Sequence, residues 1–317
     1  MPRKFSLSLS PLSIMVSSTR EQLVWFITGA TSKGFGGSLV ASALSRGDLV
    51  IATGRSQAKL NDLLEEYGQS ENLRVLQLDI TSDPKMIQAA VNKAVGFWGR
   101  IDIAVNNAGN GELGLIEETD TSRTRLQFET NFFGPLEVTK AILPHMRSRK
   151  TGTRTIVFLG SRSAWIAEHA PGLAHYSASK AALHAIVDGL SAEVSNLGIR
   201  ILLLAPGAFR TEIYKNSPFH QDNSFSDYDE IRTVATNRFA SLANKEPGDP
   251  VKAMDAVVDA VRGEGVAEGK KWPAIGTALL LGNDAEKNFY AKFDKMKAVV
   301  AEWADVARGV WFPAGTS

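Results

Sequence analysis

Short apolar runs alternate with longer stretches of helical periodicity through most of the chain. The apolar runs predict strands near residues 24–28, 48–53, 73–78, 101–106, 154–160 and 199–204. Helical patterns fall near residues 35–46, 57–68, 83–98, 122–149, 175–197 and 249–262. Because the runs are rich in Val and Ile without strict polar alternation, we expect strands covered on both faces. Alternating strands and helices with right-handed crossovers predict an α/β fold with a doubly wound parallel sheet.

The C-terminal third departs from this alternation. Residues 209–247 are punctuated by Pro218, Asp222, Asn223 and Pro247, Gly248 follows directly, and the segment carries several aromatic side chains. A long irregular segment of this kind predicts a substrate lid, and a poorly ordered surface insertion is the alternative. A further apolar run, residues 274–281, suits a buried strand or a core segment. We therefore expect a flexible tail at 1–22, a single domain at 23–282 and a helical extension at 283–317.

Composition excludes several classes of protein. The chain is 44% hydrophobic and 22% charged with a net charge of +1, so it offers no basic stripe for nucleic acid. It has no cysteine, which rules out disulfides, thiolate nucleophiles and cysteine metal sites. No apolar run reaches the roughly 18 residues of a membrane span. The serine-rich, basic start faintly resembles a mitochondrial targeting segment, but we expect a disordered tail on a cytoplasmic protein.

Residues 28–37 read TGATSKGFGG, between an apolar run and a helical pattern. In this context a glycine-rich turn can hold a pyrophosphate, because glycines admit close backbone approach and a helix N-terminus offers free N–H groups. A plain flexible turn is the alternative. The next predicted strand ends at Gly54 and Arg55, where NAD-selective folds place an acid. A guanidinium here suits a 2′-phosphate and, with Lys33 in the loop, favours NADP(H) over NAD(H).

A second group of residues carries acid–base chemistry. Tyr176 and Lys180 are four apart at the start of a helical stretch, so they share one face. An ammonium lowers the pKa of a nearby phenol and makes proton exchange with a substrate oxygen feasible near neutral pH. Ser163, just after a predicted strand, offers a hydroxyl to the same oxygen. Asn131 lies within a helical stretch, where Asn is a poor interior residue, so we expect a polar role.

Two more polar segments follow predicted strands. NNAG occupies residues 106–109, and Pro206 and Gly207 follow the sixth strand with Thr211 shortly after. Open parallel sheets bind their ligands at the carboxyl ends of the strands. We therefore expect both segments to lie at the same edge as the glycine loop.

Together these motifs resemble the classical short-chain dehydrogenase/reductase family. The matching stretches are TGATSKGFG, Asp79 in LDIT, NNAG, Asn131, Ser163, YSASK and PGAFRT, in family order over about residues 24–211. NFFG and LLLGNDA are similar to a branch with retinol- and 17β-hydroxysteroid-dehydrogenase-like members. The resemblance implies the Rossmann fold and hydride transfer between NADP(H) and a carbonyl/alcohol pair. It also implies a homodimer or homotetramer through the helices near 122–149 and 175–197.

The resemblance implies a role for each matched residue. Tyr176 acts as the general acid or base, and Lys180 lowers its pKa and binds the nicotinamide ribose. Ser163 orients the substrate oxygen, and Asn131 anchors a water of the proton relay. The implied cofactor-binding residues are Gly29, Ser32, Lys33, Gly34, Phe35, Gly36, Arg55, Asp79, Asn106, Ala108, Tyr176, Lys180, Pro206, Gly207 and Thr211.

The chain departs from the family pattern in two places. The glycine loop is one residue longer than T-G-x-x-x-G-x-G, and Arg-Ser replaces the usual Ser-Ser pair, which makes Ser161 the runner-up to Ser163. The aromatic lid predicts a mid-sized apolar ketone, aldehyde or alcohol as the substrate. Two other functions stay open on this scaffold: an NADP(H)-binding sensor without turnover, and an epimerase or dehydratase. The five histidines show no metal-ligand spacing, so we expect no metal.

Overall fold

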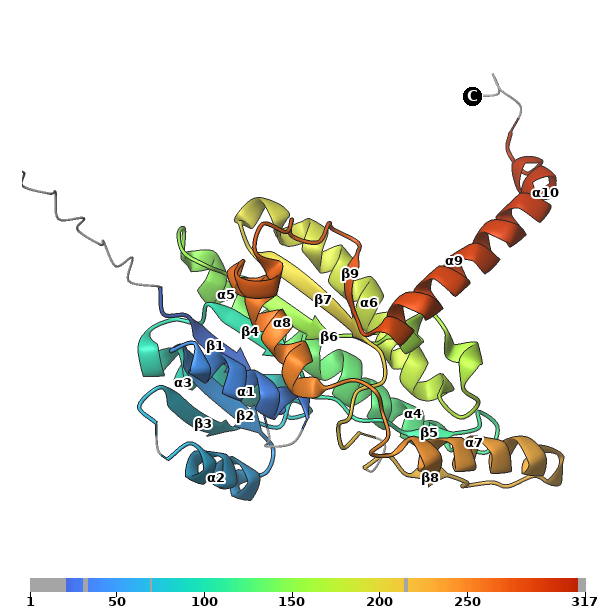
Figure 1. The fold of residues 1–317 in the computed structure, drawn as a ribbon, viewed down its shortest axis with the longest axis horizontal. Coiled ribbons are helices and arrows are strands. Elements are labelled where there is room, and N and C mark those ends of the chain that lie inside the picture. Colours follow the sequence, from blue (N-terminus) through green and yellow to red (C-terminus); the bar gives the residue numbers. More distant parts are fainter. Residues whose placement is uncertain (1–20, 31–33, 69, 214–215, 313–317) are drawn as a thin grey trace, which may run out of the picture.

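The computed structural model describes residues 21–30, 34–68, 70–213 and 216–312, and its centre is a seven-stranded sheet (Figure 1). The strand order is β3-β2-β1-β4-β6-β7-β9, and every neighbouring pair is parallel. The strands are β1 (Val24–Ile27), β2 (Leu49–Gly54), β3 (Leu73–Gln77), β4 (Ile103–Asn106), β6 (Thr155–Leu159), β7 (Arg200–Pro206) and β9 (Ala278–Leu281). A separate parallel pair joins β5 (Leu113–Gly114) to β8 (Phe219–His220). The predicted doubly wound parallel sheet is confirmed.

Helices cover both faces of the sheet. The α-helices are α1 (Phe35–Ser45), α2 (Gln57–Glu66), α3 (Pro84–Trp98), α4 (Thr121–Phe128), α5 (Gly134–Ser148), α6 (Ala174–Val194), α7 (Asp229–Leu242), α8 (Pro250–Arg262), α9 (Asn283–Glu302) and α10 (Ala304–Arg308). A π-helical turn, η1 (Glu129–Phe133), joins α4 to α5. The 3₁₀ turns are η2 (Arg162–Ala164), η3 (Ala167–His169), η4 (Ser195–Leu197), η5 (Ser226–Tyr228) and η6 (Gly265–Ala267).

The central strand β1 shows how the sequence sets the layers. All four of its residues are buried, and successive side chains of a strand point to opposite faces. Val24 and Phe26 pack with α3, α5 and α6, whereas Trp25 and Ile27 pack with α1, α2 and α8. Burying each such side chain contributes roughly 1.5–3 kcal/mol. The sheet is therefore fixed between two helical layers and becomes a rigid base for the loops at its carboxyl edge.

The helix ends follow local sequence signals. Asp83 caps α3 by accepting a hydrogen bond from the backbone N–H of Lys85 at 2.8 Å, and Pro84 takes the first helical position. Gly99, with φ of 76°, adopts the left-handed conformation that ends the same helix. The helix α8 repeats this arrangement of Asp, Pro and Gly. Such signals explain why the predicted bounds of these elements agree with the structure to within a few residues.

The structure differs from the sequence expectations in three places. The loop-like character expected for residues 209–247 is wrong over 229–242, which form α7. Only Ala235 and Phe239 of that helix are buried, so its apolar periodicity is weak. The single helix expected at 122–149 contains the π turn η1. The run at 274–281 supplies a seventh strand, β9, which pairs with the carboxyl-terminal half of β7.

The segment predicted as a lid is held against the region that follows β4. A hydrophobic cluster of Leu113, Ala170, Ala235 and Phe239 packs α7 against β5 and the approach to α6. The buried carboxylate of Glu118 accepts hydrogen bonds from Nε of Arg232 at 2.7 Å and from the backbone of Phe225 at 2.9 Å. The segment is thus joined to the body by backbone pairing, apolar contact and an ion pair.

The helices α9 and α10 form an arm that leaves the body, coloured red in Figure 1. Only the beginning of α9 packs on the sheet and on the loops that follow β6. Within the described ranges, no helix has the length and apolar character required to cross a bilayer. The same ranges contain no group of three or more His, Cys, Asp or Glu side chains placed to hold a metal ion.

Candidate active site

The predicted site residues gather where four neighbouring strands end. The strands β1, β4, β6 and β7 are adjacent in the sheet and run parallel, so their carboxyl ends lie along one edge. Gly29, Asn106, Ser161 and Pro206 lie at or just beyond these ends. A ligand placed across this edge would contact segments that are far apart in the sequence. The expectation that the glycine loop, NNAG and Pro206 share one edge is met.

The glycine loop needs its glycines for close packing. Gly29 has φ of 64°, and a Cβ built on it would lie 2.8 Å from the Cα of Ala108. A Cβ on Gly36 would lie 2.3 Å from the carbonyl oxygen of Gly29. Gly34, with φ of 105°, precedes the first turn of α1. Contacts under 3.0 Å with backbone leave no room for a side chain, so Gly29 packs closely on Ala108 and on the first turn of α1.

Asn107 ties the glycine loop to the end of β4, a role that the sequence analysis missed. Its Nδ2 donates to the carbonyl oxygens of Thr28 at 2.8 Å and Gly29 at 3.1 Å. Its backbone N–H donates to Oγ1 of Thr28 at 3.0 Å. The sequence does contain a signal for this role. Asn107 comes directly after β4, and β1, the neighbour of β4 in the sheet, is followed by Gly29. By contrast, the predicted Asn106 is buried, and its Nδ2 donates to Oγ1 of Thr139 at 3.0 Å.

Two of the predicted cofactor-binding residues, Arg55 and Asp79, follow the strands β2 and β3. Arg55 is exposed just after β2, and its carbonyl oxygen accepts a hydrogen bond from Gln77 at 2.9 Å. Asp79 follows β3, and its Oδ1 accepts from the backbone N–H and the hydroxyl of Thr81 at 2.9 and 2.8 Å. Ser32 and Lys33, which are also predicted to bind the cofactor, lie outside the described residues. The guanidinium of Arg55 is therefore solvent-accessible, at a strand end that carries no carboxylate of its own.

Lys180 is anchored beside Tyr176 on α6. The lysine is buried, and its Nζ donates to the carbonyl oxygen of Leu159, the last residue of β6, at 2.7 Å. The same Nζ lies 5.9 Å from the centroid of the Tyr176 ring. Burial lowers the pKa of Lys180 to about 8, because a desolvated ammonium is less stable than one in water. An ammonium held close to a phenol is the arrangement that favours the phenolate.

Asn131 joins three segments of the site. It lies in the π turn η1 and is fully buried. Its Oδ1 accepts from the backbone N–H of Asn110 at 3.0 Å, and its Nδ2 donates to the carbonyl oxygen of Asn110 and to Oγ of Ser179. A Cβ on Gly109 would lie 3.2 Å from Oδ1 of Asn131 and 3.6 Å from Nζ of Lys180. Asn131 and Lys180 thus converge on the same piece of backbone. Such π turns often occur at functional sites.

Two serine hydroxyls face each other in the loop after β6. The Oγ atoms of Ser161 and Ser163 are 2.5 Å apart, and both residues are buried. The backbone N–H of Ser161 donates to Nε2 of His184 at 3.2 Å. A Cβ on Gly160 would lie 2.2 Å from the same nitrogen, so His184 packs directly on this turn. The sequence analysis counted His184 only among scattered histidines, although it stands four residues after Lys180.

The aromatic ring of Trp165 packs between the helices α6 and α9. Its ring centroid lies 5.0 Å from that of His184 and 5.4 Å from that of Phe289. Arg162, on the same turn, pairs with Asp284 at 2.9 Å and donates to Asn288 at 2.5 Å. The turn that carries Ser163 is thus held between α6 and the first turns of α9.

The segment after β7 closes the edge of the site. A Cβ on Gly207 would overlap the carboxylate of Asp284, which accepts a hydrogen bond from the next backbone N–H at 2.8 Å. Thr211 lies beside the glycine loop, because a Cβ on Gly34 would be 3.6 Å from its Cβ. Phe35 packs against Phe209, with ring centroids 5.2 Å apart. The predicted cofactor-binding residue Thr211 is therefore a neighbour of the glycine loop.

The predicted lid brings further polar groups near Tyr176. A Cβ on Gly111 would lie 2.7 Å from Oγ of Ser217 and 4.0 Å from the ring of Tyr176. Next to it, Glu112 and His220 pair at 2.5 Å across the short β5–β8 sheet. No sequence pattern pointed to Ser217, Glu112 or His220, because these residues come together only when residues 209–247 fold against the body.

The comparisons with known proteins match this geometry. Residues 23–222 match the family model described as short chain dehydrogenase. Oxidoreductase BOA17 of Botryotinia fuckeliana (strain B05.10) is 31% identical over 285 residues, which cover 90% of this chain and 97% of the relative. The 11-beta-hydroxysteroid dehydrogenase 1A of Arabidopsis thaliana is 30% identical over 239 residues, covering 74% of this chain and 66% of the relative. Hydroxysteroid-dehydrogenase-like proteins are thus among its relatives, as the sequence predicts.

Solved structures share the fold. A short-chain dehydrogenase from Streptomyces avermitilis has a TM-score of 0.77 and 34% identity, covering 92% of this chain and 100% of that chain. A short chain dehydrogenase from Burkholderia cenocepacia J2315 in complex with NADP has a TM-score of 0.65 and 25% identity, covering 89% and 97%. A 3-ketoacyl-(acyl-carrier-protein) reductase from Brucella melitensis complexed with NADH has a TM-score of 0.65 and 22% identity, covering 83% and 97%. Structural neighbours thus bind either NADH or NADP.

Proposed function

Because the chain belongs to the short-chain dehydrogenase/reductase family, we propose that it is an NADP(H)-dependent oxidoreductase acting on a carbonyl/alcohol pair. The observation that carries the proposal is the placement of Lys180. Its ammonium is buried, fixed on the carbonyl oxygen of Leu159 and held beside the Tyr176 ring, at the carboxyl edge of a parallel sheet. A buried lysine is costly unless its charge has a role, and activation of a neighbouring phenol is such a role.

The residues at the edge fit a dinucleotide. The cradle at Gly29 and Gly36 has no room for a Cβ, and it leads into the N-terminus of α1. That arrangement suits a pyrophosphate, which gains from free backbone N–H groups and from the helix dipole. Gly34, Ala108 and Thr211 would complete the surface along the cofactor. The nicotinamide, when bound, supplies or accepts the hydride.

Tyr176 would donate the proton in the reducing direction. Hydride addition to a carbonyl carbon leaves charge on its oxygen, and the phenol O–H would protonate that oxygen. In the oxidising direction the phenolate would take the proton from the alcohol. Lys180 favours the phenolate because its ammonium is close and poorly screened. Its own pKa of about 8 keeps the side chain mostly protonated at neutral pH.

Ser163 would hold the substrate oxygen in place. Its hydroxyl is buried, and the contact with Ser161 lets one serine donate to the other. One serine can therefore donate its O–H to the substrate oxygen while its own oxygen accepts a hydrogen bond from the other serine. Ser161 is the alternative hydrogen-bond partner, and single alanine variants at the two positions separate the roles.

The cofactor preference rests on Arg55 and Lys33. The exposed guanidinium at the end of β2 can approach a 2′-phosphate with paired, charge-assisted hydrogen bonds. An NAD-selective protein would carry an acid there. The apolar lid, with Phe219 and Phe239 packed in its cluster, supports a mid-sized apolar ketone, aldehyde or alcohol as the substrate.

The test is NADPH oxidation over a panel of aldehydes and ketones, with NADH in parallel and Tyr176→Phe as the control. We expect turnover with NADPH, weak turnover with NADH and loss of activity in the variant, with NADPH binding retained. NADPH binding without turnover on any substrate would instead support a sensor. Absence of NADPH binding would refute the assignment of the glycine loop.

A further inference from the structure

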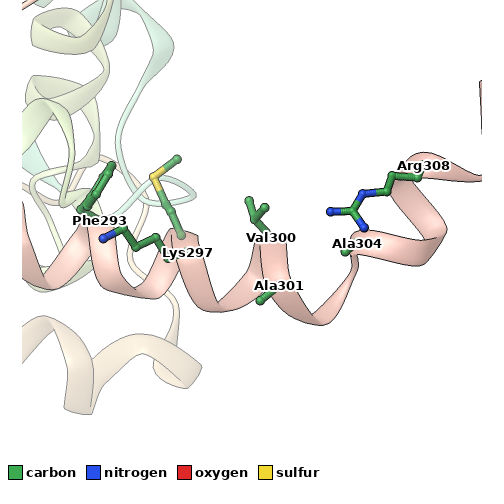
Figure 2. A pocket seen from close by; sticks show the side chains of 7 residues that line it. Phe293, Lys297, Val300, Ala301, Ala304 and Arg308 are labelled. Atoms are coloured by element: carbon green, nitrogen blue, oxygen red, sulfur yellow. The ribbon is translucent and has the colours of Figure 1, made fainter.

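The arm formed by α9 and α10 carries an apolar surface that no other described segment covers. The large apolar side chains from Tyr290 to Phe312 are exposed by between 47% at Phe293 and 88% at Phe312. Toward Ala304 and Arg308, Figure 2 shows the helix with no other ribbon beside it. Contiguous apolar patches above a few hundred Å² mark interaction sites in soluble proteins. The arm therefore has the character of a binding surface.

The spacing of the apolar residues indicates a helical partner. They recur at intervals of four, three, four and three residues along the arm, at Phe289, Phe293, Met296, Val300 and Trp303. This is the spacing of a coiled-coil seam, in which side chains of one helix insert between those of another. A shallow groove of about 340 Å³ borders the seam (Figure 2). Three seam residues, Phe293, Met296 and Val300, line one side of it, and the neighbouring residues Lys297, Ala301, Ala304 and Arg308 line the rest.

We propose that this groove takes the α9 helix of a second copy of the chain, in antiparallel orientation. From Phe293 to Trp303 the seam residues are separated by three, four and three positions, and this series of intervals is the same in both chain directions. An antiparallel copy therefore places Phe293 opposite the second copy's Trp303 and Met296 opposite the second copy's Val300. A parallel copy would bring two bodies together at the same end, because each body lies at the N-terminal end of its own α9 (Figure 1).

The exposed area suits a stable dimer. Ten large apolar side chains between residues 290 and 312 are exposed by about half or more. Five of the ten are aromatic. An aromatic side chain buries ~150–250 Å², so the five aromatic, four valine and one methionine side chains together offer on the order of 800–1,000 Å² per copy. A stable interface needs roughly 800 Å² from each partner. The arm alone supplies an area of that size.

The charges of the arm favour a protein over a membrane as the occupant. Residues 283–312 contain five acidic and five basic side chains, so the arm has no net charge. Helices that lie on a membrane surface carry Lys and Arg on their polar face. Here the polar face mixes both signs, with Asp294, Lys295, Glu302 and Asp305. A polar face of mixed charge is expected for a helix that packs its apolar face on a partner helix and keeps its polar face in solvent.

The first test compares the masses of three full-length proteins by sedimentation and light scattering. Val300→Glu puts a carboxylate in the seam, and Ala298→Glu puts the same group on the opposite, solvent-exposed face. We expect the wild type and Ala298→Glu to associate, and Val300→Glu to associate at least tenfold more weakly with an unchanged circular dichroism spectrum. A monomeric wild type, or a Val300→Glu mass equal to that of the wild type, overturns the proposal.

The second test addresses orientation and the competing occupant. Because the chain lacks cysteine, Val299→Cys introduces a single thiol. An antiparallel pair centred on residue 298 places the two copies of residue 299 on the same flank of the seam, offset by about 3 Å along the helix axis. Residue 298 lies on the outer face of each helix, so a short bismaleimide should link Val299→Cys but not Ala298→Cys. A dimer that gives no such link overturns the antiparallel register. A monomeric wild type that sediments with phosphatidylcholine/phosphatidylserine vesicles would assign the surface to a membrane.

Discussion

Replacement of His184 by Gln tests whether the turn of Ser161 and Ser163 depends on a neutral imidazole. Nε2 of His184 accepts a hydrogen bond from the backbone of Ser161, which requires an unprotonated nitrogen. Burial, with a smaller contribution from the charge of Lys180, lowers the pKa of His184 from 6.5 to about 4. In an unfolded chain the imidazole titrates near its ordinary value. The folded and unfolded states therefore bind different numbers of protons at mildly acidic pH.

The magnitude follows from this difference in pKa. Between pH 6.5 and pH 4 the unfolded chain binds a proton at His184 that the folded chain does not. The free energy of unfolding therefore falls as the pH decreases through this window. One pKa unit corresponds to about 1.4 kcal/mol, so the full window is worth on the order of 3 kcal/mol. This contribution is complete above about pH 7 and is lost by about pH 4.

The assay is denaturant unfolding of the wild type and His184→Gln at several pH values between 7.5 and 4. Gln does not titrate, and its amide oxygen can still accept from the backbone of Ser161. Carboxylates titrate in both proteins, so their effect cancels in the difference. We expect the wild type to lose stability relative to the variant by about 1.4 kcal/mol per pH unit below pH 6.5. Parallel stability curves would refute the neutral, buried state of His184.

Three further substitutions test the site. Lys180→Met should abolish turnover and raise the midpoint of thermal unfolding. The midpoint should rise because burial lowers the pKa of this lysine to about 8 and disfavours its charge. A lower midpoint for the variant contradicts this reasoning. Arg55→Ala should raise KM for NADPH by about tenfold and leave KM for NADH nearly unchanged in steady-state kinetics. Gly36→Ala should cost roughly 1–3 kcal/mol of unfolding free energy and weaken NADPH binding, because its Cβ would meet the carbonyl oxygen of Gly29 at 2.3 Å.

The sheet was predictable because its signals are local. The strands β1, β2, β3, β4, β6 and β7 are short apolar runs, and each of the first five of these is followed by a helical pattern. This alternating order, with right-handed crossovers, predicts a parallel sheet. The carboxyl edge follows from that order, so Gly29, Asn106 and Ser163 could be placed near one another without coordinates. The helix α7 was missed because only Ala235 and Phe239 face inward, which leaves little periodicity to detect.

The interactions that hold the site were less accessible to the sequence. Asn107 rather than Asn106 binds the glycine loop, and a sequence pattern cannot show which of two adjacent amides points toward a neighbouring strand. The pairing of Glu112 with His220 joins residues 108 positions apart through the short β5–β8 sheet. Such contacts depend on the path of residues 209–247, which carry few positional signals of their own.

One face of α6 organises the site from the tyrosine to the serine turn. Tyr176, Lys180 and His184 are spaced by four residues, so they stand one above another on that face. Lys180 binds the last carbonyl of β6, and His184 accepts from the backbone two residues later. The positive charge of Lys180 helps to keep His184 neutral, and a neutral His184 can hold the turn of Ser161. The helix that carries the proposed proton donor therefore also positions the hydroxyls that would face the substrate.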